Sequence, residues 1–122
     1  MSLSVKSNIQ DIALPESPSL SELEAKAGHV AARLAEAGNP KRLLILCHLA
    51  KLEHEGTGEA SVGALQREIG LSQSALSQHL ARLRASGMVA TRRESQTIHY
   101  RLADAETRAL MAALYAVFCA PQ

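Results

Sequence analysis

One helical stretch carries side chains suited to contacting base edges. In residues 71–87, LSQSALSQHLARLRASG, Leu76, Leu80 and Leu83 recur at spacings of four and three and form one apolar stripe. The opposite face carries amide or hydroxyl side chains and one charge: Gln73, Ser74, Ser77, Gln78 and Arg82. Amides near a helix N-terminus can bond to base edges in a DNA major groove, whereas a merely solvated face favours Glu and Lys. We interpret the stretch as a DNA-recognition helix, with a polar solvent-facing helix as the alternative.

Two cysteines, Cys47 and Cys119, are the other residues with reactive side chains. Thiols can be oxidised or persulfidated and then bridged to each other. Free cysteines are also among the most buried residue types and behave as small hydrophobes, and composition alone favours this reading for Cys47. Two cysteines in a chain of 122 residues do not suggest a structural disulfide framework.

The charge is unevenly distributed along the chain. The formal net charge is only +1, but residues 72–101 hold five arginines against one glutamate, a local net charge of +4. The rest of the chain has eight basic and eleven acidic residues, a net charge of −3. One basic region on an acidic body is the electrostatic pattern of a phosphate-binding surface.

Other kinds of chemistry find little support in the sequence. No Ser/His/Asp constellation, glycine-rich phosphate loop or paired-carboxylate signature can be placed, so we do not expect an enzyme, and no cofactor is expected. The five histidines contain no HxxxH pair, and Cys47 and His48 would point about 100° apart on a helix. We therefore expect no metal site. No apolar run approaches a membrane span and no signal peptide is recognisable, so we expect a cytoplasmic protein.

The sequence of the N-terminal half indicates an arm followed by two helices. Residues 1–16 lack lasting periodicity and are interpreted as a flexible arm. A first helix begins with a Ser19–Glu22 capping box, carries a coiled-coil-like apolar seam and ends at Gly38. Asn39 and Pro40 start a second helix, whose residues 42–52 are apolar almost all round and therefore predict a central, buried helix. Residues 53–60 read as a loop.

The C-terminal half predicts a helix-turn-helix followed by a wing. Ser61 caps a short helix over 62–69, a turn at 70–72 leads into the recognition helix, and Gly87 ends it. Residues 89–93 and 97–102 predict a β-hairpin joined by residues 94–96. Asp104 caps a last helix that runs to about residue 120. This helix has two apolar stripes, one for the chain's own core and one for a partner: Leu110, Leu114, Val117 and Met111, Tyr115, Phe118.

These motifs resemble the ArsR/SmtB family of small dimeric winged-helix repressors over roughly residues 19–120. The resemblance rests on GNPKRLLIL at 38–46, SVGALQREIGLSQSALSQHLARLRASGMVATRR at 61–93 and QTIHYRL at 96–102. LSQSALSQHL is similar to the nodulation-regulator branch. The resemblance implies a mainly α fold with a small β-hairpin, a winged helix-turn-helix domain over 17–120 with the helix-turn-helix at about 61–86 and the wing at 88–102. It also implies a homodimer formed by the first and last helices.

The resemblance and the residues together imply a function. The chain is expected to repress transcription by binding a pseudo-palindromic operator in double-stranded DNA. The expected contacts come from the recognition helix and the wing: Gln73, Ser74, Ser77, Gln78, Arg82, Arg92, Arg93 and Gln96. Lys41 and Arg42 are further candidates for holding phosphate, although Arg42 could equally stabilise the fold.

The resemblance also bears on the cysteines and on metals. The family's Cys-x-Cys and last-helix Asp/His metal sites have no counterpart here. The placement of Cys47 and Cys119 is similar to the sulfide-responsive, biofilm-growth repressor branch, which implies a thiol switch that responds to persulfide, polysulfide or an oxidant and releases DNA. Two alternatives remain, a repressor without a small-molecule inducer and a winged-helix protein-interaction module.

Overall fold

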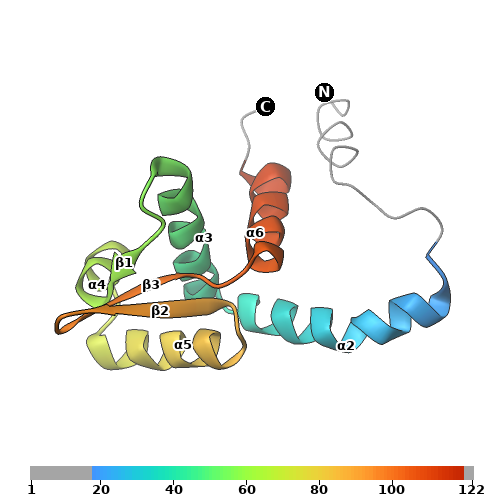
Figure 1. Cartoon of the computed structure of the whole chain (residues 1–122), viewed down its shortest axis with the longest axis horizontal. Coiled ribbons are helices and arrows are strands. Elements are labelled where there is room, and N and C mark those ends of the chain that lie inside the picture. Colours follow the sequence, from blue (N-terminus) through green and yellow to red (C-terminus); the bar gives the residue numbers. More distant parts are fainter. Residues whose placement is uncertain (1–17, 120–122) are drawn as a thin grey trace.

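The computed structural model describes residues 18–119 (Figure 1). Within this range the chain forms helices α2 to α6 and strands β1 to β3. In chain order they are α2 (Leu20–Ala37), α3 (Pro40–Glu55), β1 (Ala60–Ser61), α4 (Val62–Ile69), α5 (Gln73–Ala85), β2 (Val89–Glu94), β3 (Thr97–Leu102) and α6 (Ala105–Phe118). The expected winged helix-turn-helix is confirmed, with α4 and α5 as its two helices and the β2–β3 hairpin as its wing.

Side chains just before the helices cap their N-termini. Side-chain oxygens of Ser19, Ser61, Ser72 and Asp104 each accept a hydrogen bond from the backbone N–H three residues on, at 2.8–3.2 Å. Asn39 Oδ1 accepts from the backbone N–H groups of the second and third residues after it, at 2.9 and 3.0 Å. These bonds satisfy N–H groups that a helix start otherwise leaves without partners.

The core joins the helix-turn-helix to α3 and the wing. Leu76, Leu80 and Leu83 of α5 are almost completely buried, which confirms the apolar stripe read from the sequence. They share one hydrophobic cluster with residues of α3, α4, the wing and α6: Ile45, Leu46, Leu49, Leu65, Met88, Val89, Leu102 and Met111. Since α5 buries one face here, its opposite face is fixed toward the outside.

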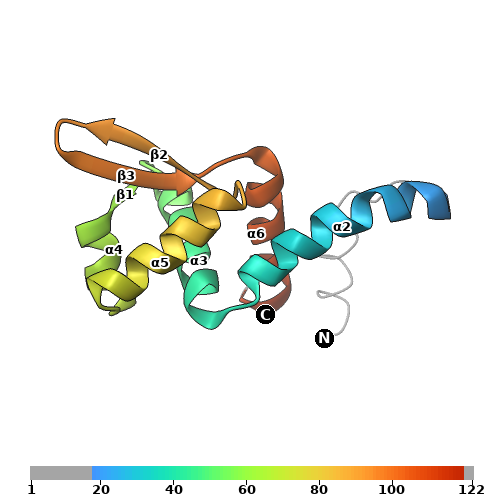
Figure 2. The ribbon, with the colours of Figure 1, turned by 90° about the horizontal axis from the view of Figure 1, so that it is seen from below.

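Helix α2 projects beyond the rest of the molecule (Figures 1 and 2). Its apolar seam is exposed, with Leu20, Leu23, Val30 and Leu34 all 46–70% accessible. Polar contacts tie α2 to the start of α6, where Arg33 Nη1 donates to Thr107 Oγ1 at 2.6 Å and Arg33 Nη2 donates to Asp104 Oδ2 at 3.2 Å. The seam that the sequence assigns to a partner is therefore free in the single chain.

Three sequence predictions need correction around α3 and β1. Helix α3 is not buried all round, because Leu44 is 48% accessible and Cys47 is exposed while Ile45, Leu46 and Leu49 face the core. The predicted loop over 53–60 is shorter, since α3 continues to Glu55. Ala60 and Ser61 form a third strand, β1, which pairs antiparallel with β3 and places Ala60 opposite Tyr100. A strand of two residues is too short to show a period in the sequence.

The wing and the last helix also differ in detail from the predictions. Glu94 belongs to β2 and pairs with Thr97, so the hairpin turn consists of residues 95 and 96. In α6, Met111 is buried while Tyr115 and Phe118 of the same predicted stripe are exposed. The predicted stripe is therefore buried in the middle of α6 and exposed near its C-terminal end. The arm at 1–16 and the predicted end of the last helix at residue 120 fall outside the described residues.

Candidate nucleic-acid interface and thiol pair

The outer face of α5 is polar, exposed and largely uncharged. Gln73, Ser74, Ser77 and Gln78 are all exposed, and they lie on the side of α5 away from its buried leucines. Within residues 18–119, the side chains of Gln73, Ser77 and Gln78 make no hydrogen bond to the protein, while Ser74 Oγ lies 3.4 Å from Ser72 Oγ. The structure thus brings these four predicted contacts together on one free surface.

The wing carries the other predicted contacts on an exposed hairpin. Arg93 and Gln96 are exposed, and Arg93 has no ion-pair partner among the described residues. Ser95, in the turn, has a φ of +55°, a left-handed conformation that L residues adopt at a cost. Arg92 is also exposed but is engaged, because its Nη2 and Nε donate to the Glu59 carboxylate at 2.8 and 3.0 Å. The pKa of Glu59 is lowered chiefly by this hydrogen bond from Arg92.

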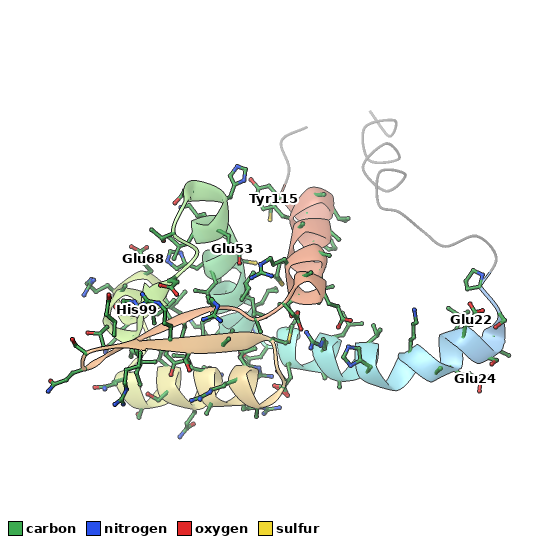
Figure 3. The ribbon with its side chains drawn as sticks, viewed as in Figure 1. Glu22, Glu24, Glu53, Glu68, His99 and Tyr115 are labelled. Carbon is green, nitrogen blue, oxygen red and sulfur yellow. The ribbon has the colours of Figure 1, made fainter. Side chains whose placement is uncertain are left out.

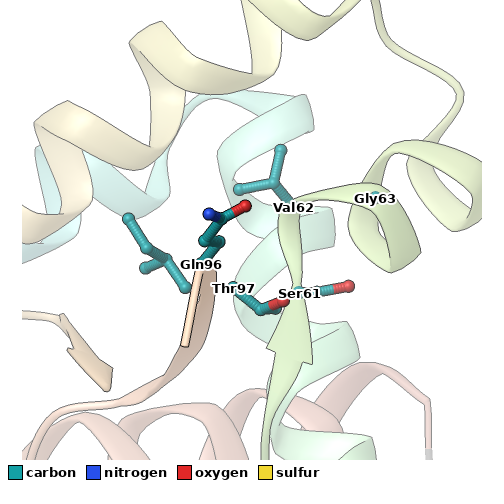
Figure 4. Close-up of a pocket in the computed structure, with 6 residues that line it drawn as sticks. Ser61, Val62, Gly63, Gln96 and Thr97 are labelled. Carbon is teal, nitrogen blue, oxygen red and sulfur yellow. The ribbon is translucent and has the colours of Figure 1, made fainter. Parts of the chain in front are cut away.

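An open hollow lies between the wing and the start of α4 (Figure 4). It has a volume of about 330 Å³ and is lined by residues 61–63 and 96–98. Gln96 and Val62 extend into it from opposite sides in the close-up. A side-chain nitrogen of Arg67 lies 3.6 Å from the position that a Cβ on Gly63 would take.

Two further basic residues stabilise the protein's own fold. Arg82 Nη2 and Nε donate to the Glu36 carboxylate at 2.7 and 3.2 Å, so this predicted DNA contact already has a partner. Arg42 is buried and its Nε donates to the Glu36 backbone oxygen at 2.7 Å, which favours its structural role over phosphate binding. Lys41 is exposed at the start of α3.

Cys47 lies in α3 and Cys119 directly follows α6 as its C-cap residue, and these two helices pack against each other (Figure 1). Figure 3 shows Glu53 of α3 between these helices, where its Oε2 accepts from Arg108 Nε of α6 at 2.8 Å. Cys47 and Cys119 are both exposed free thiols. Desolvation by the surrounding protein atoms raises the pKa of the Cys47 thiol above its usual value of 9.0, and Cys119 raises it further. The two thiols are therefore within electrostatic range of each other, although they are 72 residues apart in sequence.

The described part of the chain offers no obvious metal or membrane site. Between residues 18 and 119, no three His, Cys, Asp or Glu side chains are grouped so that they could hold a metal ion. Nor does any helix in that range combine the length and apolar character needed to cross a membrane.

Comparison with known proteins identifies the family. Residues 39–91, which span α3 to the first half of β2, match the family model described as bacterial regulatory protein, arsR family. The chain is 44% identical over 103 residues to the biofilm growth-associated repressor of Agrobacterium fabrum, covering 84% of this chain and 83% of that protein. The chain belongs to the ArsR family. It is a DNA-binding transcriptional regulator, and the expectation that it is not an enzyme agrees with the regulators it resembles.

The nodulation-like sequence of this ArsR-family regulator also has a counterpart. The chain is 47% identical over 85 residues to the nodulation protein NolR of Rhizobium meliloti, covering 70% of this chain and 65% of that protein. Both branches that the sequence resembles are thus found among its relatives.

Solved structures support the fold. Reduced HlyU from Vibrio cholerae superposes with a TM-score of 0.73 at 42% identity and covers 83% of this chain and 100% of its own. A homodimeric winged helix-turn-helix DNA-binding domain from Mycobacterium bovis superposes with a TM-score of 0.66 at 29% identity, covering 83% of this chain and 88% of its own. The fold predicted from the sequence is therefore confirmed by structures as well as by sequence relatives.

Proposed function

We propose that this regulator represses transcription as a homodimer that reads a pseudo-palindromic operator with α5 and grips the DNA backbone with the wing. The observation that carries this proposal is the exposed amide and hydroxyl face of α5. Gln73 and Gln78 can each bond to adenine in bidentate fashion, while Ser74 and Ser77 can approach base edges or phosphates closely. Arg93 and Gln96 on the wing are suited to contact the DNA backbone.

A homodimer would account for the apolar surface that the single chain exposes. Leu23, Val30 and Leu34 of α2 and Tyr115 and Phe118 of α6 are 46–79% accessible. Large exposed apolar surfaces commonly mark protein–protein interfaces. The structural neighbour from Mycobacterium bovis is a homodimeric domain, which supports the same assembly for this chain. Two-fold symmetry would place one α5 in each of two successive major grooves, about one helical turn apart.

Operator reading can be tested by alanine substitution in α5 and in the wing. A duplex selected from a random library by the unmodified protein serves as the specific probe, and a scrambled duplex of equal length as the non-specific one. We expect Gln73→Ala and Gln78→Ala each to weaken binding to the selected duplex by about tenfold, and binding to the scrambled duplex much less. Arg93→Ala should weaken both similarly and lower the salt dependence, because it removes a phosphate contact. Equal losses on both duplexes for the Gln variants would contradict base reading.

The same regulator is proposed to sense reactive sulfur through Cys47 and Cys119. One thiolate attacks a sulfane sulfur of an inorganic polysulfide, which gives a cysteine persulfide and releases a polysulfide one sulfur shorter. The second thiolate then attacks Sγ of the persulfidated cysteine, which forms the Cys47–Cys119 disulfide, breaks the bond to the outer sulfur and releases that sulfur as HS⁻. The two thiols together lose two electrons, which reduce one sulfane sulfur to sulfide. Two observations support the proposal. Both thiols are exposed and Cys119 influences the pKa of Cys47. In addition, the structure of the relative HlyU from Vibrio cholerae is known in a reduced form.

A disulfide between α3 and α6 would change how these helices pack. Because α6 carries part of the proposed dimer surface, the bridge would alter the spacing of the two α5 helices and release the operator. We expect polysulfide treatment to lower the intact mass by two hydrogen atoms and to abolish binding to the selected duplex. After the same treatment, Cys119→Ser should form no bridge and should still bind the selected duplex. If no sulfur-bridged species forms, or if Cys119→Ser is released as readily as the unmodified protein, the switch does not operate.

A further inference from the structure

Glu36 is a charged side chain that is largely withdrawn from solvent near the end of a mostly exposed helix. It lies in the last turn of α2, next to the corner at Gly38 that leads into α3. Its side chain is only 16% accessible, whereas Glu22 and Glu24 lie exposed near the other end of α2 (Figure 3). A carboxylate withdrawn in this way needs charged or hydrogen-bonding partners to offset its lost hydration.

The first partner of Glu36 is Arg82 in the last turn of α5. The two carboxylate oxygens of Glu36 accept from Arg82 Nη2 at 2.7 Å and from Nε at 3.2 Å, which is the two-point geometry of a guanidinium–carboxylate pair. The hydrogen bond from Arg82 is the largest cause that lowers the pKa of Glu36, so its carboxylate stays ionised at neutral pH. The Nε and Nη2 edge of Arg82 that would bind a phosphate in bidentate fashion is occupied by this carboxylate.

The second partner is Arg42 at the start of α3. Arg42 is 7% accessible, its Nε donates to the Glu36 backbone oxygen at 2.7 Å, and the same Nε lies 3.6 Å from Glu36 Oε2. A buried guanidinium requires a counter-charge, and Glu36 supplies it. One carboxylate therefore lies between cations from α3 and α5 and connects both helices to the end of α2.

This connection fixes the recognition helix relative to the proposed dimer helix. In Figure 2 the end of α5 that carries Arg82 approaches the same end of α2 that carries Glu36. The spacing of two α5 helices in a dimer depends on how each is held against its own α2. We propose that Glu36 is a positioning residue for operator recognition, and that Arg82 acts through Glu36 to orient α5 rather than as a phosphate ligand. This inference rests on the proposed operator-reading dimer.

The competing role for Arg82, direct phosphate contact, makes opposite predictions. Losing a phosphate contact weakens binding to every duplex alike and reduces the slope of log affinity against log salt by about one. Losing a positioning contact weakens binding to the selected duplex, where two α5 helices must register with two half-sites. It leaves the salt slope on the scrambled duplex unchanged.

A double-mutant cycle of Glu36→Gln and Arg82→Gln separates the two roles. Each variant is compared with the unmodified protein for affinity to the selected and the scrambled duplex over a range of salt, and for its melting temperature. We expect each single variant to lower the ratio of selected to scrambled affinity by about fivefold. The double variant should be no worse than Glu36→Gln, because Glu36→Gln already removes the contact that Arg82→Gln disrupts. Arg82→Gln leaves the Glu36–Arg42 contact in place, so its result stands even if Glu36→Gln unfolds.

Glu53→Gln is the matched control, since Glu53 pairs with Arg108 between α3 and α6 and lies away from α5. It should leave the affinity ratio unchanged. The inference is overturned if Arg82→Gln lowers the salt slope and weakens both duplexes equally, or if the ratio is the same in every variant. These results would leave the proposed function intact whenever Gln73→Ala still loses selectivity. If the unmodified protein selects no duplex, the proposed function and this inference fail together.

Discussion

At the residue scale, the structure separates basic side chains that are free from those already engaged. The sequence places Arg82, Arg92 and Arg93 among the DNA contacts, but Arg82 and Arg92 each make two-point contacts with a glutamate of the same chain. Arg93 has no ion-pair partner within residues 18–119. The local charge of +4 therefore overstates the number of cations that are immediately available to phosphate. The carboxylates concerned, Glu36 and Glu59, lie outside the basic segment and their pairing could not be read from its spacing.

The reactivity of Cys47 gives a prediction at this scale. Burial first and Cys119 second hold the pKa of Cys47 above 9.0, so little thiolate exists at neutral pH. In Cys119→Ser, where burial remains, we expect the rate of Cys47 alkylation by iodoacetamide to continue rising above pH 9.0. The rate can be followed by intact mass from pH 7 to pH 11. The same variant unfolded in urea is the control, and its alkylation rate should level off at a lower pH. Identical pH profiles for the folded and the unfolded variant would contradict the role of burial.

At the element scale, the turn between α4 and α5 sets the direction of the recognition helix. Gly70 ends α4 with a φ of +80°, and its N–H donates to the Gln66 carbonyl at 2.9 Å. Glycine adopts this left-handed conformation without the steric cost that a Cβ brings. Ser72 then caps α5 two residues later. The helix-turn-helix thus depends on a glycine and a serine at fixed spacing.

Substitution of Gly70 tests this dependence. No atom lies within 4 Å of the position that a Gly70 Cβ would take, so Gly70→Ala should act through backbone strain alone and lower the free energy of unfolding by about 1 kcal/mol. Gly63→Ala is the matched control, because Gly63 lies in helix α4 with ordinary φ and should be neutral or stabilising by about 0.5 kcal/mol. Urea denaturation measures both. Equal effects at the two sites would show that the left-handed turn is not what Gly70 provides.

The elements were predictable where local chemistry specifies them. Ser19, Asn39, Ser61 and Asp104 cap helices as the sequence indicates, because a cap needs only its own neighbours in the chain. Strand β1 was missed, since its two residues become a strand only by pairing with β3. The exposure of Leu44 and Cys47 was missed for a related reason: an apolar helix face looks the same whether its own core or another surface covers it.

At the scale of the whole molecule, the exposed apolar side chains concentrate on the elements away from the wing. Leu20, Leu23, Val30 and Leu34 line α2, while Tyr115, Val117 and Phe118 end α6. The outer face of α5, which is proposed to read DNA, is by contrast polar. The single chain thus separates the surface proposed for a partner protomer from the surface proposed for DNA.

This separation predicts how assembly and DNA binding respond to substitution. Leu23→Glu and Phe118→Glu should each raise the dimer dissociation constant by at least about tenfold, because each places a charge where ~1.5–3 kcal/mol of apolar burial is expected. Sedimentation equilibrium measures the change. Lys51→Glu, at an exposed charged position of α3, should leave the dimer unchanged. Dimers of undiminished affinity in both apolar variants would place the interface elsewhere.

The projecting α2 also affects how the regulator responds to its own abundance. If an isolated chain exposes its apolar seam and only paired chains bind an operator, the amount of active species at low copy number grows with the square of the number of chains made. A twofold rise in expression would then give up to a fourfold rise in operator-binding dimer. Occupancy of a weak operator would thus rise more steeply with the amount of this protein than it would for a regulator that binds the same sequence as a monomer.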